Sequence, residues 1–271
     1  MACAVVALTL VVGAACKHEL PTMENGEGKT TGRAIYSTRT VNFTRPDGSY
    51  IGSAAVADFG NLDGGGWSSR AFLQDSTFKV LVVADQTTTA GVTQNVDISD
   101  GSEYELQYKV KFDPNFHFRS LGKFGFGFLI GDGNTGCDPG WDGKGGSLRN
   151  MWVTRGADTV LIPYIYHKDQ PAECGNSFMA RYPATGSISK GVWHTIKLYA
   201  KSNTGSNTDG HVKMEVNGTV VLDQAIRWTT FDTKKYINKM SIHTFRGGGD
   251  ASSPSDGYIY YDDVTWTKLT P

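Results

Sequence analysis

The chain has 271 residues, which is enough for one large β domain with a buried core. Its 26 Lys and Arg residues nearly balance 27 Asp and Glu residues, so overall charge gives it no affinity for nucleic acid or for an anionic membrane. Any attraction for a polyanion must be local. With 33 Gly, 13 Phe, 12 Tyr and 6 Trp, the composition is typical of a turn-rich β protein.

The N-terminal residues predict export. Residues 2–15, ACAVVALTLVVGAA, form an apolar run too short to span a bilayer comfortably, and the run ends in small residues as a signal peptide does. We expect a signal peptide over 1–15 and lipidation of Cys16, with simple cleavage and release as the alternative. Residues 16–31 lack apolar periodicity, which predicts a flexible tether before a domain over 32–271. Membrane contact is expected only through that lipid.

Two cysteines remain for the folded part, Cys137 and Cys174. In an oxidising compartment such a pair is more often a disulfide than a metal site or a nucleophile. We expect it to tie the glycine-rich loop 131–146 to the loop after Tyr166. The Asp residues of loop 131–146 lack the spacing of a calcium-binding EF-hand, so we expect no metal and no other cofactor.

Strand patterns dominate from residue 33 onward. In chain order they are VLVVA at 80–84, YELQYKVKF at 104–112, GFGFLIG at 125–131, WHTIKLYAK at 193–201, HVKMEVNGTVVLD at 211–223 and GYIYYDDVTWTKL at 257–269. Asn217-Gly218 predicts a two-residue hairpin turn, because both residues tolerate positive φ. Helices should be few and short. An all-β, antiparallel two-sheet β-sandwich of the jelly-roll type follows, with a concave substrate groove on one sheet.

Residues 145–167, GGSLRNMWVTRGADTVLIPYIYH, contain two polar pairs at alternate positions. Side chains two apart on a strand point to the same side, so Ser147 lies with Arg149, and Tyr164 lies with Tyr166. The turn residues at 155–158 are consistent with a hairpin between the two strands. If the strands pair, a hydroxyl, a guanidinium and two phenols converge on one patch. The alternative is ordinary packing of the tyrosine rings with the arginine stacked on them.

Further candidates are isolated side chains. Lys123 in SLGKFGFGF is either a solvated strand lysine or a cation at the same patch. Trp141, Trp152 and Trp193 could offer platforms for sugar rings, although Trp193 in GVWHTI is more simply interpreted as a core residue. His167 directly follows Tyr166 and is the best placed histidine for binding, although strand alternation points it to the opposite face. Three other histidines are candidates for proton transfer but are interpreted as polar or structural: His117, His194 and His243.

Six ordered blocks, over roughly residues 100–265, resemble alginate lyases of polysaccharide lyase family 14. They are RSLGKFGFGFLIGDG, GGSLRNMW, YIYH, GVWHTIKLY, MSIHTFRGGGD and YIYYDDV. The resemblance implies a β-jelly roll and cleavage of a uronate polymer. The family's Gly-Lys, Ser-x-Arg and Tyr-x-Tyr motifs fall on Gly122-Lys123, on Ser147-Leu148-Arg149 and on Tyr164-Ile165-Tyr166, which implies catalytic and substrate-binding roles there.

The implied reaction, β-elimination, removes the C5 proton beside a uronate carboxylate and expels the C4 oxygen. Arg149 can hold that carboxylate through two parallel hydrogen bonds and stabilise the charge that develops. Lys123 either shares this role or acts as the base, with its pKa lowered by burial and by Arg149. Tyr164 or Tyr166 is the other candidate base, if neighbouring cations lower its pKa. Ser147 is interpreted as a hydrogen-bond donor to the carboxylate or to a tyrosine.

Two other classes of protein fit parts of the sequence. A non-catalytic carbohydrate-binding module could use the same sandwich, but it needs no cations converging with a phenol. A jelly-roll glycoside hydrolase needs two carboxylates across the scissile bond, and no Glu-x-Asp-x-Glu strand pattern occurs. We therefore predict a monomeric, exported polysaccharide lyase acting on an acidic polysaccharide. Alginate is the first candidate substrate, with glucuronan or a related polyuronate as the alternative.

Overall fold

The structure, a computed structural model, describes residues 35–63, 67–86, 90–247 and 255–270. The expected signal peptide, Cys16 and the tether therefore lie outside the described residues. All of the described residues belong to one compact unit. Within the described ranges, no helix is both long and apolar enough to cross a membrane.

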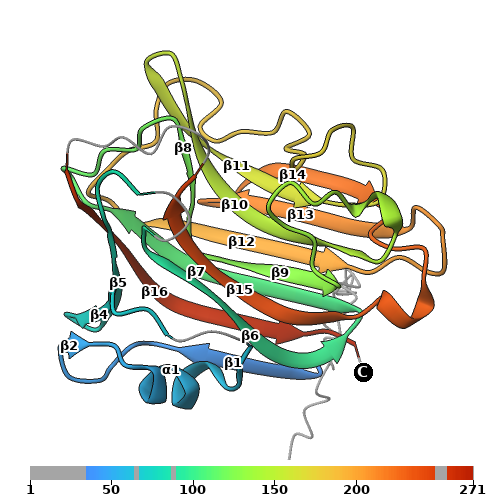
Figure 1. Cartoon of the computed structure of the whole chain (residues 1–271), viewed down its shortest axis with the longest axis horizontal. Helices are drawn as coiled ribbons and strands as arrows, with labels where there is room; N and C mark the ends of the chain where they lie inside the picture. The colour runs from blue at the N-terminus through green and yellow to red at the C-terminus, as the bar shows by residue number, and fades with distance from the viewer. Residues whose placement is uncertain (1–34, 64–66, 87–89, 248–254, 271) are drawn as a thin grey trace, which may run out of the picture. The chain divides into compact units, whose positions relative to one another are not determined.

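Two antiparallel sheets make up the fold (Figure 1). The nine-stranded sheet has the order β14 (Thr219–Ile226), β13 (Gly210–Val216), β12 (His194–Lys201), β7 (Glu103–Phe112), β16 (Gly257–Lys268), β5 (Thr77–Val82), β4 (Ala71–Gln74) and β2 (Gly48–Ser49), and β1 (Ser37–Val41) pairs with β16. The seven-stranded sheet has the order β11 (Asp158–Tyr166), β10 (Gly145–Arg155), β8 (Leu121–Lys123), β15 (Ile237–Arg246), β6 (Val92–Gly101) and β3 (Leu62–Asp63), and β9 (Phe126–Gly131) lies between β10 and β15.

The predicted fold class is confirmed. Helical segments are short in the described part of the chain: α1 (Gly52–Phe59) and the 3-10 turns η1 (Gly140–Asp142) and η2 (Asp232–Lys234). β13 and β14 form the predicted hairpin, whose turn residues Asn217 and Gly218 have φ of 52° and 77°. Such angles favour Asn and Gly, which explains why the sequence signal was reliable there.

The hydrophobic core lies between the two sheets. Rings from one sheet contact rings from the other, as Phe112 of β7 does with Trp152 of β10 and Tyr108 of β7 does with Phe126 of β9. Strand alternation then directs the neighbouring side chains away from the core. The face of the seven-stranded sheet turned away from the nine-stranded sheet is called its outer face here. That face carries the candidate site.

Candidate active site

The hairpin of β10 and β11 brings the two polar pairs together. In its register Ser147 lies opposite Tyr166 and Arg149 lies opposite Tyr164. Leu148 and Ile165, the residues between them, are buried in the core. Alternation therefore leaves both polar pairs on the outer face of the sheet. Cross-strand partners of this kind have Cβ atoms about 4.5–5.5 Å apart, which is close enough for their side chains to act together.

Lys123 reaches the same patch from β8, where it pairs with Met151 of β10. Its Nζ atom lies 3.9 Å from the centre of the Tyr164 ring. The preceding residue must be glycine, because a Cβ atom on Gly122 would lie 2.0 Å from the ring of Trp152. Gly122 therefore lets the strand pack closely on the Trp152 ring in the core, and Lys123 places its amine on the outer face of the sheet.

Arg149 completes the cluster. The central carbon of its guanidinium lies 5.6 Å from the centre of the Tyr164 ring and 5.3 Å from that of Tyr166. The two phenol oxygens are 3.4 Å apart. Two cations and two phenols therefore meet on one patch, which the sequence alone left conditional on strand pairing.

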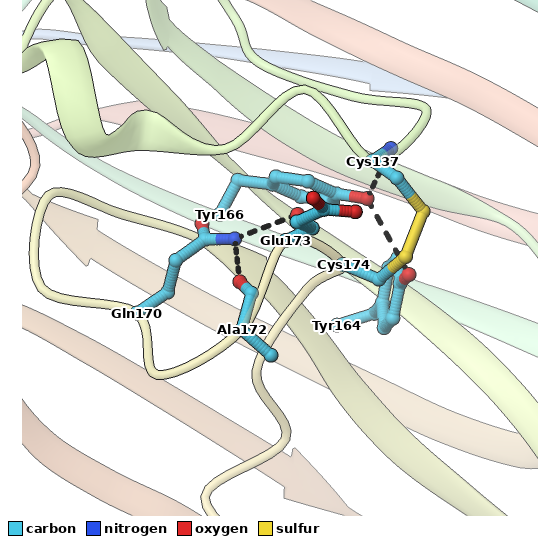
Figure 2. Close-up of a disulfide and its surroundings, with 7 residues drawn as sticks. All are labelled: Cys137, Tyr164, Tyr166, Gln170, Ala172, Glu173 and Cys174. Atoms are coloured by element: carbon cyan, nitrogen blue, oxygen red, sulfur yellow. Dashed lines mark hydrogen bonds between the residues drawn. A yellow bond between two sulfur atoms is a disulfide. The ribbon is translucent and has the colours of Figure 1, made fainter.

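Cys137 and Cys174 form a disulfide beside the tyrosine pair (Figure 2). The backbone N–H of Cys137 donates a hydrogen bond of 2.8 Å to the phenol oxygen of Tyr166. On the other side of the bridge, a Cβ atom on Gly175 would lie 3.0 Å from the rings of both Tyr164 and Tyr166. The linked loops therefore press against the rings, and Tyr166 is fully buried beneath them.

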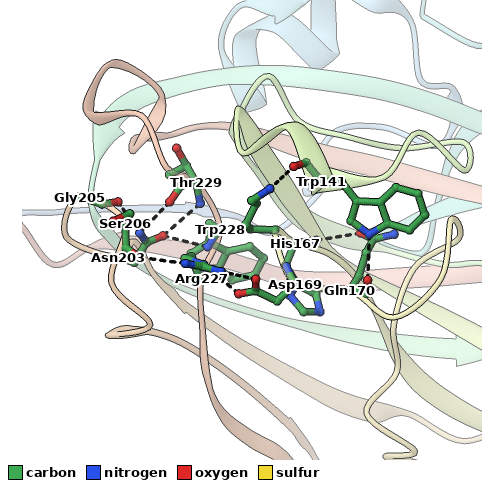
Figure 3. Close-up of polar contacts among 11 residues, drawn as sticks. Trp141, His167, Asp169, Gln170, Asn203, Gly205, Ser206, Arg227, Trp228 and Thr229 are labelled. Carbon is green, nitrogen blue, oxygen red and sulfur yellow. Dashed lines mark hydrogen bonds and ion pairs between the residues drawn. The ribbon is translucent and has the colours of Figure 1, made fainter.

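Polar contacts hold the loop between β11 and Cys174 in place (Figure 3). The side chain of Gln170 accepts a hydrogen bond from the N–H of His167 and donates to the carbonyls of Ala172 and Glu173. Arg227 forms an ion pair with Asp169. These contacts fix the chain between the end of β11 and the disulfide, so the cover over Tyr166 has a defined position.

Burial controls the charges at the site. The pKa of Lys123 lies well below its ordinary value, first because the ammonium is desolvated and second because Arg149 is near. Desolvation also lowers the pKa of Arg149, and the two phenols oppose this effect. Desolvation raises the pKa of Tyr164 to about 12. The prediction that cations lower a phenol pKa is therefore wrong for Tyr164, because burial outweighs the nearby charge of Arg149.

Several buried polar atoms at the site have no hydrogen-bond partner within the described chain. They include Nε and Nη2 of Arg149, Oγ of Ser241 and Nδ1 of His243. Buried polar groups are normally satisfied, and leaving one unpaired costs about 1–3 kcal/mol. Two donors of the buried Arg149 guanidinium are thus left unpaired, at a cost to the stability of the fold.

His243 belongs to this site, although the sequence interpretation made it structural. It lies on β15, and both Arg149 and Lys123 act on it electrostatically. Burial, then these two cations, lowers its pKa to about 3, so the ring is neutral. Ser241 and His243 lie two apart on one strand, as do the polar pair on β10 and the tyrosine pair on β11 that the sequence analysis identified. It was missed because nothing in the sequence says which strand is the neighbour of β8.

Three predicted substrate-binding residues are placed differently. Trp152 is fully buried in the core, where its ring packs against Phe112 and Phe116, so its prediction as a sugar platform is wrong. Ser147 is also fully buried, and its hydroxyl donates to the carbonyl of Asn134 rather than to a tyrosine. His167 stacks on Phe178 and bonds to Asn176 within the loop after β11. These side chains support the site rather than face a ligand.

The arrangement suits proton transfer next to a bound carboxylate. It offers a guanidinium with free donors, an amine with lowered pKa and a phenol that stays protonated. Over the described ranges, no three His, Cys, Asp or Glu side chains gather as metal ligands would. The amine, the guanidinium and the phenol that do meet here can perform acid–base chemistry.

Comparison with known proteins places the chain in a family. The family model described as Polysaccharide lyase 14 matches residues 74–264. The alginate lyase Aly36B is 47% identical in sequence, with a TM-score of 0.83, and the match covers 88% of this chain and 99% of that one. The PL-14 alginate lyase of Aplysia kurodai, at 21% identity and a TM-score of 0.64, covers 88% of this chain and 100% of its own and shows the fold alone.

A curated relative, Exolysin of Paramecium bursaria Chlorella virus 1, is 28% identical in an alignment of 194 residues that covers 61% of this chain. The chain spans only 29% of that relative's length. The family model, by contrast, matches well over half of the chain and includes Lys123, Arg149 and both tyrosines. The chain therefore belongs to the polysaccharide lyase 14 family.

Proposed function

We propose that the protein depolymerises a uronate polysaccharide of the alginate type by β-elimination. The observation that carries this proposal is the buried guanidinium of Arg149, which has two unpaired donors and lies over the same Tyr164 ring as Lys123. Membership of the polysaccharide lyase 14 family supports the reaction, and the likeness to the alginate lyase Aly36B supports the substrate class.

Arg149 binds the carboxylate of the sugar whose C5 proton is removed. Nε and Nη2 have no partner among the described residues, and a guanidinium can present two parallel N–H groups to one carboxylate. As the proton leaves C5, negative charge spreads into that carboxylate. A fixed cation in a site with little water stabilises this charge more than a solvated one would.

Lys123 is the proposed base, and Tyr164 is the proposed acid. Neutral Lys123 takes the C5 proton, and the phenol of Tyr164 gives its proton to the departing C4 oxygen. Nζ of Lys123 lies 3.9 Å from the centre of the Tyr164 ring, which is close enough for the two groups to act on one sugar. A base must be deprotonated and an acid protonated at working pH, and burial shifts both pKa values in the required direction.

Neither alternative class of protein is favoured. A binding module gains nothing from burying an amine and a guanidinium against a phenol, because each desolvated group costs stability. A hydrolase needs a pair of carboxylates at the bond, whereas the groups that meet here are cations and phenols.

The test is a substrate panel. Purified protein is mixed with alginate, glucuronan or pectate, and the ultraviolet absorbance of the new C4–C5 double bond is followed. We expect a rise with alginate, and a loss of at least about 10²-fold in rate for Tyr164→Phe. Tyr236→Phe, at a surface tyrosine that is 38% exposed, is the matched control and should keep full activity. No rise with any polyuronate would refute the proposal, and an active Tyr164→Phe would remove this phenol as the acid.

A further inference from the structure

A second cluster of cations and rings lies on the nine-stranded sheet. On its face away from the core, Lys79 of β5 pairs with Tyr260 of β16, which pairs in turn with Lys111 of β7. Tyr258 lies two residues before Tyr260 on β16, on the same face of the sheet, and Trp193 directly precedes β12. We call these five residues the lysine–aromatic strip.

Cations and rings alternate along the strip. Nζ of Lys111 lies between two rings, 4.7 Å from the centre of Trp193 and 4.9 Å from that of Tyr260. Nζ of Lys79 lies 3.9 Å from the ring centre of Tyr258 and 5.8 Å from that of Tyr260. Because β5, β16 and β7 are neighbours, the strip crosses at least two strand spacings, which is about 10 Å.

The two lysines of the strip form no ion pair with any residue that the structure describes, although Lys79 donates a hydrogen bond to Gln74. The other half of the same sheet face differs. There the cations are matched by acids, in the pairs Lys197–Glu105, Lys213–Glu215 and His211–Asp223. Near the strip, Asp113 accepts a hydrogen bond from the hydroxyl of Tyr260 and so helps to orient that ring.

This pattern complements one kind of ligand. A polyuronate presents a carboxylate on every sugar and an apolar C–H face on every ring. Carboxylates are attracted to ammonium groups that have no other anionic partner, and sugar faces pack on aromatic rings. The strip offers both at a spacing of a few ångströms, and Trp193 is 37% exposed.

We propose that the lysine–aromatic strip is a second binding site for the acidic polysaccharide, separate from the active site. The proposal rests on the substrate class proposed above. The active site and the strip lie on the outer faces of different sheets, with the core between them. A short oligosaccharide cannot occupy both, whereas a long chain or a gel of many chains can. The strip therefore holds the enzyme on polymer between cleavage events.

The first test measures binding without catalysis. Migration is compared in non-denaturing gels with and without entrained sodium alginate, using Lys123→Ala as the parent so that the polymer stays intact. Adding Lys79→Gln with Lys111→Gln should weaken retardation at least fivefold. The charge-matched control adds Lys197→Gln with Lys213→Gln instead, which removes the same charge from the same face of the sheet. Retardation of this control should change less than twofold. Trp193→Ala keeps every charge and should also weaken retardation.

Equal retardation of the strip variant and the charge-matched control would overturn the proposal, as would an unchanged Trp193→Ala variant. The second test uses the catalytically competent protein. With Lys123 intact, the variant that carries Lys79→Gln and Lys111→Gln should lose at least threefold in kcat/KM on polymeric alginate. On an alginate tetrasaccharide it should lose less than twofold. Equal losses on both substrates would count against a separate site. Because retardation needs no cleavage, it tests the strip even if the lyase reaction itself were refuted.

Discussion

At the scale of single residues, desolvation shifts the pKa values of the side chains that we expect to act in the reaction. Lys123 and Arg149 are only 7% and 5% exposed, and the charged form of each is penalised by burial. The same burial that frees the Lys123 amine for proton transfer leaves donors of Arg149 unsatisfied. Groups of this kind cost stability until a ligand binds, so the site should trade stability for activity.

The change Lys123→Met tests that trade. It removes the desolvated amine and keeps an unbranched chain of similar length. Activity on alginate should fall at least about 10²-fold. The melting temperature should rise by about 2–4 °C for each kcal/mol gained in a domain of this size. Lys144→Met, at a side chain that is 51% exposed, should alter neither quantity. A lower melting temperature for Lys123→Met would show that burial of the amine is not a cost to the fold.

At the scale of elements, the β10–β11 hairpin positions the site and the disulfide covers it. One face of the hairpin carries Arg149 and Tyr164, and the other carries Trp152 into the core. A shift of one residue in the register would exchange these faces, so core packing fixes the geometry of the site. The disulfide adds a constraint from outside, because the N–H of Cys137 bonds to Tyr166.

Removing the bridge with Cys137→Ala and Cys174→Ala tests that constraint. The two cysteines are 37 residues apart, for which chain entropy alone gives a stabilisation of roughly 4 kcal/mol. We expect a lower denaturation midpoint and, well below it, a loss of activity, since Tyr166 loses a fixed donor. Reduction of the unmodified protein with dithiothreitol should reproduce both effects. Full activity of the reduced protein would mean that the bridge stabilises the loops without positioning the tyrosine.

At the scale of the whole molecule, buried neutral histidines should set the acid limit of stability. The pKa of His243 is lowered to about 3 and that of His167 to about 4, chiefly by desolvation. An unfolded histidine titrates near 6.5, so below that pH the unfolded state binds more protons than the folded state. Stability should therefore fall as the pH drops from about 6.5 toward 4.

Urea unfolding between pH 7 and 4 measures this dependence. Asp58 and Asp169 have pKa values lowered from 3.8, so their contribution is lost only at lower pH. His243→Gln should flatten the slope of midpoint against pH, whereas His117→Gln at an exposed position should not. An unchanged slope in His243→Gln would mean that this ring is protonated in the folded protein.

Local sequence was sufficient to predict the fold class and many of the residues that form the site. Alternation and turn residues are properties of neighbouring positions, so they predicted the sheets, the hairpin at Asn217-Gly218 and the same-face pairs. Resemblance added Lys123, because a lone strand lysine carries no signal of its own. Trp152 was misplaced, since an aromatic residue on a strand looks alike whether it faces the core or a ligand.

Only the tertiary structure decided what depends on distant parts of the chain. It placed β15 beside β8 and so brought His243 to the site, although 120 positions separate it from Lys123. It also set the pKa of Tyr164, where burial outweighs the neighbouring cation, against the sequence-based expectation. Residue type and spacing are written in the sequence, but desolvation is a sum over all neighbours, and neighbours exist only once the sheets have packed.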